Sequence, residues 1–408
     1  MLAATSTAIA TAAARRKHLC MSFRGAIRVN KYLPNPTPLA FMERWGRTLL
    51  WCGGLSLALI ASVLASATIG PVSIPVPVVA RVVLDGISVP TLALASGPSE
   101  TGAAAVSLAR LGVGIEFVSL FEFSVPETSR VIIAQLRLPR IVLAAVVGFS
   151  LASAGAVMQG FFRNPMADPS IIGVSSGAAA GAVAFIVFPL SVPFGLQGMA
   201  FGGALAAAFL VYLIATEGGR TPVATLLLAG IAIQTFLGAV ISFILLQAGW
   251  QLQEAVYWLM GHLQASTWEE VSATLPVALL AFAVLAAYAR DLNVLLLGEA
   301  DARSLGIEVE RTKRILLGIA SVITAGAVAV AGVIGFVGLI VPHVMRLLVG
   351  PDHRILLPTS ALAGAVFLVL ADTAARTGPA ELPVGIVTAA LGAPFFIYLL
   401  RRREVHAL

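Results

Sequence analysis

The stretch that decides the fold is residues 138–161, LPRIVLAAVVGFSLASAGAVMQGF. After Arg140 it contains no charged residue, and it is long enough to cross a bilayer as a helix, which needs about 20 apolar residues. Small residues fill its middle, from Gly148 to Gly155. Such residues let helices approach closely in lipid, where packing replaces the hydrophobic effect. The stretch therefore predicts a membrane-spanning helix inside a compact bundle.

The composition of the whole chain points the same way. Of its 408 residues, 59% are hydrophobic and 11% are charged, whereas soluble domains carry roughly a quarter charged residues. A chain this apolar cannot cover its surface in water and needs a bilayer as its solvent. The net charge of +6 comes mainly from arginines at the ends of apolar segments. That placement is typical of membrane proteins and does not indicate nucleic-acid binding.

The apolar segments predict about ten spans. We expect them at residues 46–67, 138–161, 171–189, 196–216, 223–247, 271–289, 315–331, 334–349, 356–375 and 384–400. Residues 68–136 contain no clean span, because Arg81, Asp85 and Pro90 interrupt their apolar part. The chain is thus predicted to be an all-α, multi-pass membrane protein with one domain over 46–403. A basic tail at 1–45, expected to be disordered, precedes this domain, and a short tail at 404–408 follows it.

The charges of the loops predict the sidedness of the chain. Cytoplasmic loops carry an excess of Lys and Arg. The N-terminal tail is basic and the chain closes with Arg401-Arg402-Arg403, whereas residues 248–270 contain three glutamates and neither Lys nor Arg. Both termini are therefore predicted to be cytoplasmic. Residues 68–136 and 248–270 are predicted to be external, the first partly extended or interfacial.

The sequence shows no chemistry of its own. It has only three lysines and no Gly-Lys-Ser or Gly-Lys-Thr, so it lacks a phosphate-binding loop for ATP. Neither its histidines nor Cys20 and Cys52 show metal-ligand spacing, and no metal or other cofactor is expected on this chain. Acids in mid-span, which ion-coupled carriers use, are also scarce, Asp372 being the nearest and close to a span end. The energy source is therefore expected on another chain.

The longest cytoplasmic loop, residues 290–314, mixes leucines with charges. It predicts two short helices that end at Gly298 and Gly306. Leucines exposed in the cytosol gain nothing unless a partner covers them. Docking to a cytosolic partner is therefore preferred to the alternative, an amphipathic helix lying on the membrane.

Several motifs in order resemble the FecCD-type permeases, which are the permease subunits of ABC importers for iron–siderophores, haem and cobalamin. They are RLPR at 137–140, QGFFRNPMADP at 159–169, GVSSGA at 173–178, LGE at 297–299, GFVGLIVPH at 335–343, GPDHR at 350–354, ADTAAR at 371–376 and ELPVG at 381–385. The resemblance covers about residues 46–403, apart from much of 68–130. It implies ten helices per subunit and a homodimer in the cytoplasmic membrane of a prokaryote. It also implies two cytosolic ATPase subunits and an external substrate-binding protein.

The resemblance further implies roles for individual residues. The ATPase-coupling loop maps to about 293–311, with Asn293, Gly298, Glu299, Ala302, Arg303, Leu305 and Gly306. The docking arginines for the binding protein map to Arg137, Arg140 and Arg376, whose alternative role is snorkelling to lipid phosphates. The translocation path and its gate map to Thr221, Pro222, Val223, Ala224, Thr225, Gln234, Thr235 and Ser242. Because Gln234 and Thr235 are adjacent, at least one must pack between helices.

These observations predict a transport subunit and not an enzyme, with ATP and magnesium bound by the partner ATPase. The expected cargo is an iron chelate, a ferric siderophore or haem, and cobalamin is the alternative within the family. A secondary transporter would need a mid-membrane carboxylate pair or broken helices, and the sequence shows no such pair. A lipid-embedded enzyme would need a mid-membrane cluster of His, Asp or Ser, and no such cluster is visible. The external His262 is a weak sign of haem, because single loop histidines are common.

Overall fold

The computed structural model describes residues 38–70, 72–86, 88–94, 113–119, 123–378 and 380–402. Its contacts divide the chain into two units, Met1–Leu50 and Trp51–Leu408. Of the first unit only residues 38–50 are described, as the beginning of helix α2, Pro38–Thr68. The predicted tails, 1–45 and 404–408, otherwise lie outside the described residues.

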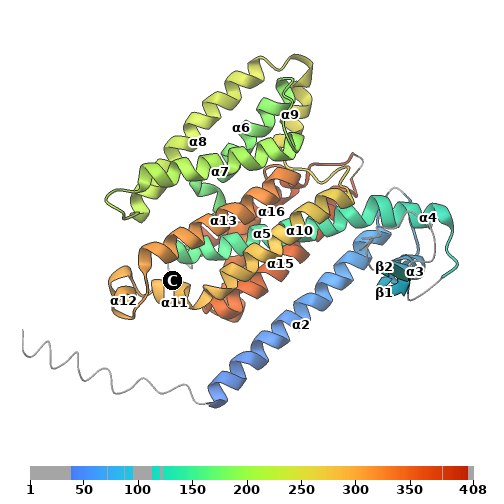
Figure 1. Cartoon of the computed structure of the whole chain (residues 1–408), viewed down its shortest axis with the longest axis horizontal. Coiled ribbons are helices and arrows are strands. Elements are labelled where there is room, and N and C mark those ends of the chain that lie inside the picture. Colours follow the sequence, from blue (N-terminus) through green and yellow to red (C-terminus); the bar gives the residue numbers. More distant parts are fainter. Residues whose placement is uncertain are drawn as a thin grey trace, which may run out of the picture. The chain divides into compact units, whose positions relative to one another are not determined.

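Each of the ten predicted spans corresponds to an α-helix in the described part of the chain (Figure 1). These helices are α2, α5 (Leu138–Phe161), α6 (Val174–Val187), α7 (Gly195–Ala215), α8 (Val223–Leu246), α10 (Trp268–Ala287), α13 (Val309–Ala331), α14 (Val337–Val349), α15 (His353–Ala375) and α16 (Val384–Arg402). By length and composition, seven described helical stretches can cross a membrane, and Val174–Val187, Val337–Val349 and Val384–Leu399 are shorter apolar helices. The all-α membrane fold is confirmed.

The second span begins earlier than the sequence predicts. Helix α4, Glu127–Val131, and a π-helical turn, Ile132–Arg137, run directly into α5. Pro139 normally marks a helix start, since it has no N–H to donate. Here the N–H of Leu138 bonds instead to the carbonyl of Ile133, and this wider turn carries the helix through the proline.

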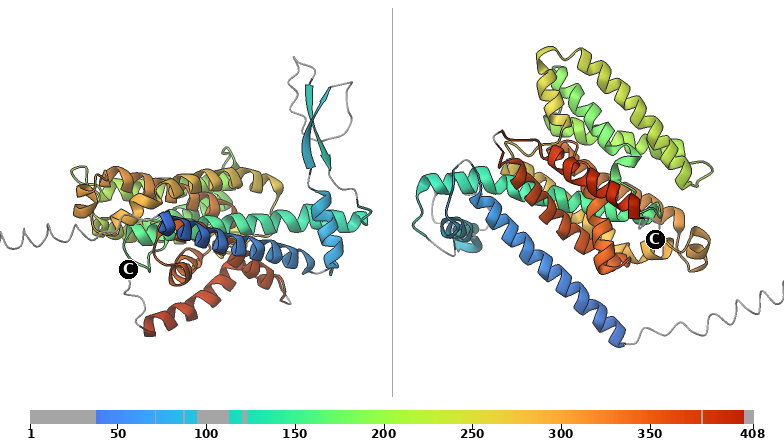
Figure 2. Two further views of the ribbon diagram at one scale, coloured as in Figure 1. Left: turned by 90° about the horizontal axis from the view of Figure 1, so that it is seen from below. Right: turned by 180° about the vertical axis from the view of Figure 1, so that it is seen from behind.

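The described residues of the segment between α2 and α4 contain no helix long enough to cross a membrane. It holds a short helix, α3 (Val76–Asp85), and two strands, β1 (Ser88–Leu94) and β2 (Val113–Ser119). The strands pair antiparallel, with Ser88 opposite Ser119 (Figure 2). Arg130 on α4 pairs with Asp85 at 2.5 Å. The partly extended character predicted for residues 68–136 is present, although the strand pair itself was not foreseen.

Helix α5 is the centre of the bundle. It packs against α10, α13, α14 and α15, and α13 joins this group to α6 and α7 (Figure 1). Glycines make the closest approaches: a Cβ atom on Gly155 would overlap the carbonyl of Gly338 on α14, and one on Gly148 would overlap that of Gly364 on α15. The small residues predicted as a packing surface therefore hold backbone against backbone.

The connections between helices gather at two ends of the bundle. At what we call the Lys313 end, a hydrogen bond joins segments 288–308 and 350–352. There Lys313 of α13 contacts both loop 216–222 and Glu299 of segment 288–308. At the other, the Asp372 end, hydrogen bonds join segments 66–75, 137–140, 260–267 and 376–383. This grouping is the one that the predicted alternation of cytoplasmic and external loops requires.

A first prediction tests the glycine contacts. Replacing Gly155 with Val should destabilise the bundle by about 1–3 kcal/mol or more, because the added carbons meet backbone that cannot move aside. The matched control is Gly53→Val, since a Cβ atom at Gly53 has no neighbour within 4 Å. The measurement is the yield of monodisperse protein in detergent and its thermal midpoint. Equal behaviour of the two variants would contradict the packing role.

Candidate functional site

At the Asp372 end, a buried carboxylate lies between two arginines. Nε and Nη2 of Arg140 donate to Asp372 at 3.0 and 2.7 Å, and Nε of Arg376 lies 3.1 Å from its Oδ2 atom. The side chains are almost covered, with 12% of Arg140, 8% of Arg376 and 1% of Asp372 exposed. A carboxylate held in this bidentate way fixes α5 against α15.

The network reaches the surface through Glu381. Arg140 also donates to Glu381, Nε2 of Gln264 donates to Glu381 at 2.5 Å, and the hydroxyl of Tyr257 donates to Gln264 at 2.6 Å. Burial opposes ionisation of Glu381, but the hydrogen bonds from Gln264 and Arg140 outweigh it, so the pKa of Glu381 lies below its usual range. Glu381 is 34% exposed and is the negative group that this network offers to the outside.

The three arginines predicted for docking point inward. Besides the contacts of Arg140, Arg376 donates through Nη2 to the hydroxyl of Ser66 at 2.5 Å. Arg137 is buried and donates to the carbonyl of Ala67 at 2.6 Å, in the last turn of α2. That turn exposes carbonyls without helical partners, which a cation satisfies well. These arginines therefore organise the Asp372 end, and their docking role stays a prediction.

His262, the external histidine, is packed into the same end. Its ring lies 5.3 Å from the ring of Tyr257. Burial and then the positive charge of Arg140 lower the pKa of His262. Its surroundings thus disfavour the charged form of the imidazole.

At the Lys313 end, the two short helices predicted in the long loop are present. They are α11, Ala289–Leu295, and α12, Glu299–Ser304. Gly298 and Gly306 follow them with φ of +121° and +85°, values that favour glycine. Ala302 is buried and anchors α12, whereas Arg303 is half-exposed. Leu297 and Leu305 are 63% and 61% exposed.

This loop is braced against the bundle. Nδ2 of Asn293 donates to Asp352 at 2.6 Å, and its Oδ1 atom accepts from the N–H of His353 at 2.9 Å. Glu299 pairs with Lys313 at 2.5 Å. Asn293 therefore faces the first turn of α15 and does not face outward. These contacts hold the backbone that carries the exposed Leu297 and Leu305 in place against the bundle.

The predicted path residues on α8 divide between two faces. Nε2 of Gln234 donates to the carbonyl of Ile171 at 2.7 Å, so this side chain packs between elements. Thr235 and Ser242 are exposed and donate to carbonyls of their own helix. Thr225 shares the exposed side, together with the large apolar residues Leu228, Ile231, Phe236, Phe243 and Leu246. In the gate segment, Thr221 is buried, Val223 is half-buried, and Pro222 and Ala224 are exposed.

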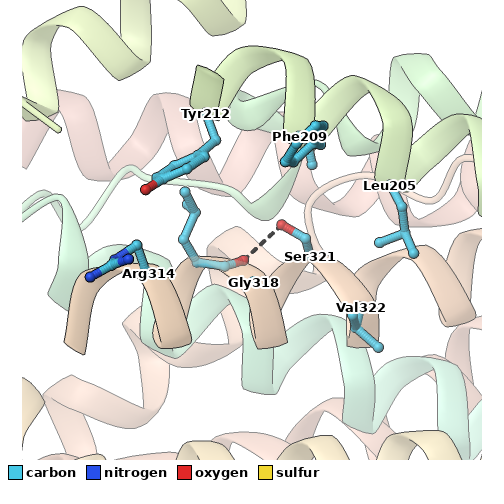
Figure 3. A pocket seen from close by; sticks show the side chains of 9 residues that line it. Leu205, Phe209, Tyr212, Arg314, Gly318, Ser321 and Val322 are labelled. Atoms are coloured by element: carbon cyan, nitrogen blue, oxygen red, sulfur yellow. Dashed lines mark hydrogen bonds between the residues drawn. The ribbon is translucent and has the colours of Figure 1, made fainter. Parts of the chain in front are cut away.

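Two hollows on the bundle do not resemble ligand sites. One, of about 340 Å³, lies between α7 and α13 (Figure 3). Tyr212 and Phe209 of α7 face α13 there, and Arg314 stands at one end. The other, of about 300 Å³, has an entirely apolar lining that includes Phe149 and Leu279. Neither shows the converging polar groups that fix a ligand. Within the described residues, no three His, Cys, Asp or Glu side chains group as metal ligands.

The apolar helices and the two charged ends define a multi-pass membrane protein whose charged groups lie at the ends of its bundle. Residues 101–402 match the sequence profile of the FecCD transport family. The chain therefore belongs to the FecCD transport family, the permease subunits of ABC importers.

Individual relatives agree with this membership. The chain is 57% identical to the cobalamin import system permease protein BtuC of Halobacterium salinarum, over 90% of this chain and 100% of that protein. It is 40% identical to the hemin transport system permease protein HmuU of Yersinia pestis, over 79% and 97% of the two chains. Among solved structures, a metal-chelate type ABC transporter in an inward-facing conformation matches with a TM-score of 0.68 and 31% identity. That match covers 86% of this chain and 98% of that one.

Sequence reasoning missed the partners of the charged residues. Nothing in the sequence indicated that Glu381 and Asp372 share Arg140, or that Lys313 contacts Thr221. One signal was present for Lys313, which is the only lysine after residue 31 in an arginine-rich chain.

A second prediction tests the Asp372 network. Replacing Asp372 with Asn leaves two buried guanidinium groups with too little negative charge. Breaking one partner of a buried pair costs about 3–5 kcal/mol. The measurement is the midpoint of thermal unfolding in detergent. The control is Glu217→Gln, because the side chain of Glu217 is exposed and forms no hydrogen bond among the described contacts. A midpoint equal to that of the control would show that the network does not stabilise the fold.

A third prediction concerns pH. The pKa of His262 in the folded state lies below the unfolded value of about 6.5. At pH values between these two pKa values, the unfolded chain therefore binds more protons at His262 than the folded chain does. Stability is therefore complete above the unfolded pKa and is lost as the pH falls toward the folded one. Thermal midpoints should decline from about pH 7.5 to about pH 5.5, and His262→Gln should reduce this decline. Identical slopes for the wild type and the variant would contradict the assignment.

Proposed function

We infer that this chain is the permease of an ATP-driven cobalamin importer. It works as a homodimer in the cytoplasmic membrane of a prokaryote, with both termini in the cytoplasm. Two cytosolic ATPase subunits bind ATP and magnesium, and an external binding protein delivers the cargo. The observation that carries the proposal is the pair of exposed leucines, Leu297 and Leu305, on the braced α11–α12 loop.

The geometry of that loop fits a coupling role. Exposed leucines beside charged groups mark a surface that a partner covers. Asn293 and Glu299 tie the loop to α15 and α13, so a push on the leucines reaches the bundle without first bending the loop. Rigid-body motion is transmitted by stiff elements of this kind.

The cargo proposal rests on similarity. The relative named for cobalamin is 57% identical over its whole length, whereas the relative named for hemin is 40% identical. This favours cobalamin, the second of the two cargoes expected from the sequence. An iron chelate remains the other candidate, favoured by the metal-chelate type structure. His262 adds little support for haem, since its ring packs on Tyr257.

The path is proposed along α8. Its exposed face offers the hydroxyls of Thr225, Thr235 and Ser242 between large apolar side chains. The hydroxyls of Thr235 and Ser242 already bond to their own helix, so this face would hold a passing ligand only weakly. Weak binding suits a conduit whose selectivity lies in the binding protein.

We propose that Arg137, Arg140 and Arg376 affect docking of the binding protein without contacting it. Their guanidinium groups are turned inward, so they would set the position and charge of the surface residues around Glu381. Among these groups, Glu381 is the one that a binding protein can reach most directly.

The test of the function is uptake into liposomes that contain this chain with its ATPase, in the presence of the binding protein. Cyanocobalamin, haem and a ferric siderophore are offered separately, with and without ATP on the ATPase side. ATP-dependent accumulation of cobalamin is the expected result. Accumulation of an iron compound instead would change the cargo, and uptake driven by an ion gradient without ATP would overturn the importer proposal.

A fourth prediction tests the coupling surface. Leu305→Asp should reduce uptake about tenfold or more, because an unpaired charge in an interface costs several kcal/mol and 1.4 kcal/mol is tenfold. Ser272→Asp, which adds the same charge at an exposed position of α10 outside the loop, is the control. Membrane insertion, measured by yield in detergent, should be equal for both. Unchanged uptake by the Leu305 variant would exclude the docking assignment.

A further inference from the structure

A single buried lysine joins three elements at the Lys313 end. Lys313, in the first turns of α13, has a side chain that is only 6% exposed. Its Nζ atom lies 2.5 Å from Oε1 of Glu299 on α12 and 3.8 Å from Oε1 of Glu310 on its own helix. It also donates to the backbone carbonyl of Thr221 at 3.1 Å. The ammonium group thus donates to a backbone carbonyl and lies within ion-pair distance of two carboxylates.

The segment before α8 is held on both sides of one residue. While Lys313 binds the carbonyl of Thr221, the N–H of Thr221 donates to Oε2 of Glu310 at 3.2 Å. Thr221 is buried, and the next residue, Pro222, is the N-cap of α8. Two side chains from the start of α13 therefore grip the backbone where α8 begins.

The cluster has balanced charge. Two glutamates face Lys313, and Arg303 supplies the second positive charge, at 3.2 Å from Glu299 and 4.0 Å from Glu310. Burying an ammonium group is costly unless it is paired and hydrogen-bonded. This cluster meets both conditions, because the ammonium group of Lys313 is paired with Glu299 and donates to the carbonyl of Thr221.

The rest of the loop before α8 has few ties to its surroundings. Gly218 and Gly219 take positive φ values of +57° and +77°. A Cβ atom on either would have no neighbour within 4 Å. Glu217 and Arg220 bond through their backbones to each other. Thr221 is thus the point at which this loop is fastened to α13 and, through Lys313 and Glu299, to α12.

We propose that Lys313 is a positioning residue that carries movement of α12 to the start of α8. The proposal rests on the proposed function, in which α12 receives the push of the ATPase and α8 lines the path. A displacement of α12 pulls on Glu299, Lys313 and the carbonyl of Thr221 in turn. The first turn of α8 then moves together with the docking loop. ATP hydrolysis and opening of the path are coupled through this contact.

The test uses Lys313→Met in the complete transporter in liposomes, with ATP hydrolysis and uptake measured on the same sample. Uptake per ATP hydrolysed should fall about tenfold, within the range of couplings between sites, while the rate of hydrolysis stays near that of the wild type. Lys313→Arg should restore part of the uptake, since it keeps the cation. Arg81→Gln is the matched control, because Arg81 is an exposed arginine on α3, outside the coupling loop.

A second variant separates coupling from folding. Lys313→Met alone leaves the half-buried Glu299 and Glu310 to share a single cation, Arg303, among the described contacts, so it can also lower the yield. The double variant Lys313→Met with Glu299→Gln removes that imbalance. A structural role predicts that yield and uptake recover together in the double variant. The coupling role predicts that the yield recovers and uptake per ATP does not.

Spin labels give a readout that does not depend on transport rates. Cysteines are placed at Glu217 and Ser304, which are exposed, after Cys20 and Cys52 are replaced by serine. Their distance distribution should stay narrow through ATP binding in the wild type and broaden with Lys313→Met. Equal distributions together with equal uptake per ATP would overturn the proposal. If the wild-type transporter took up no cargo with ATP, the proposed function itself would fail.

Discussion

The bundle depends on backbone contact between α5 and its two neighbours. Lipid offers helices no hydrophobic reason to associate, so close packing has to supply the attraction. Gly155 meets Gly338 on α14, and Gly148 meets Gly364 on α15, each at a spacing that leaves no room for a side chain. With α5 held in this way, Arg140 at one of its ends and Gly160 at the other are placed against α15, where Asp372 and His353 lie.

The charged groups then act at the two ends of this packed centre. The Asp372 end is a network of bidentate pairs that fixes helix ends and presents Glu381. The Lys313 end is a smaller cluster that holds a loop by its backbone. Both clusters contain ion pairs, of Arg140 and Arg376 with Asp372 in one and of Lys313 with Glu299 in the other. They differ in what they hold: one joins helices to each other, and the other joins the α11–α12 loop to the start of α8.

Much of this architecture was predictable from local patterns. Apolar length located the ten helices, the small residues of α5 indicated a packing face, and Gly298 and Gly306 marked the ends of the short helices α11 and α12. The charged contacts were less accessible. Lys313 and Thr221 are 92 residues apart, and Arg140 and Asp372 are 232 apart, so no local periodicity links them. Likewise, the direction of Arg137 depends on where α2 ends, which its own motif does not encode.

The short helices have a consequence for how the bundle is covered. Helix α6 has 14 residues, and at a rise of 1.5 Å per residue it reaches roughly 21 Å, less than the hydrocarbon thickness of about 30 Å. Irregular backbone is tolerated at membrane depth only where protein or water covers it, as the 3-10 turn Pro169–Ile172 is covered by Gly230 and Gln234 of α8. No residue of α6 is exposed, because α7, α8, α9 and α13 pack around it. A helix too short to span the bilayer is thus shielded from lipid by its neighbours, and the bilayer does not have to adapt its thickness to it.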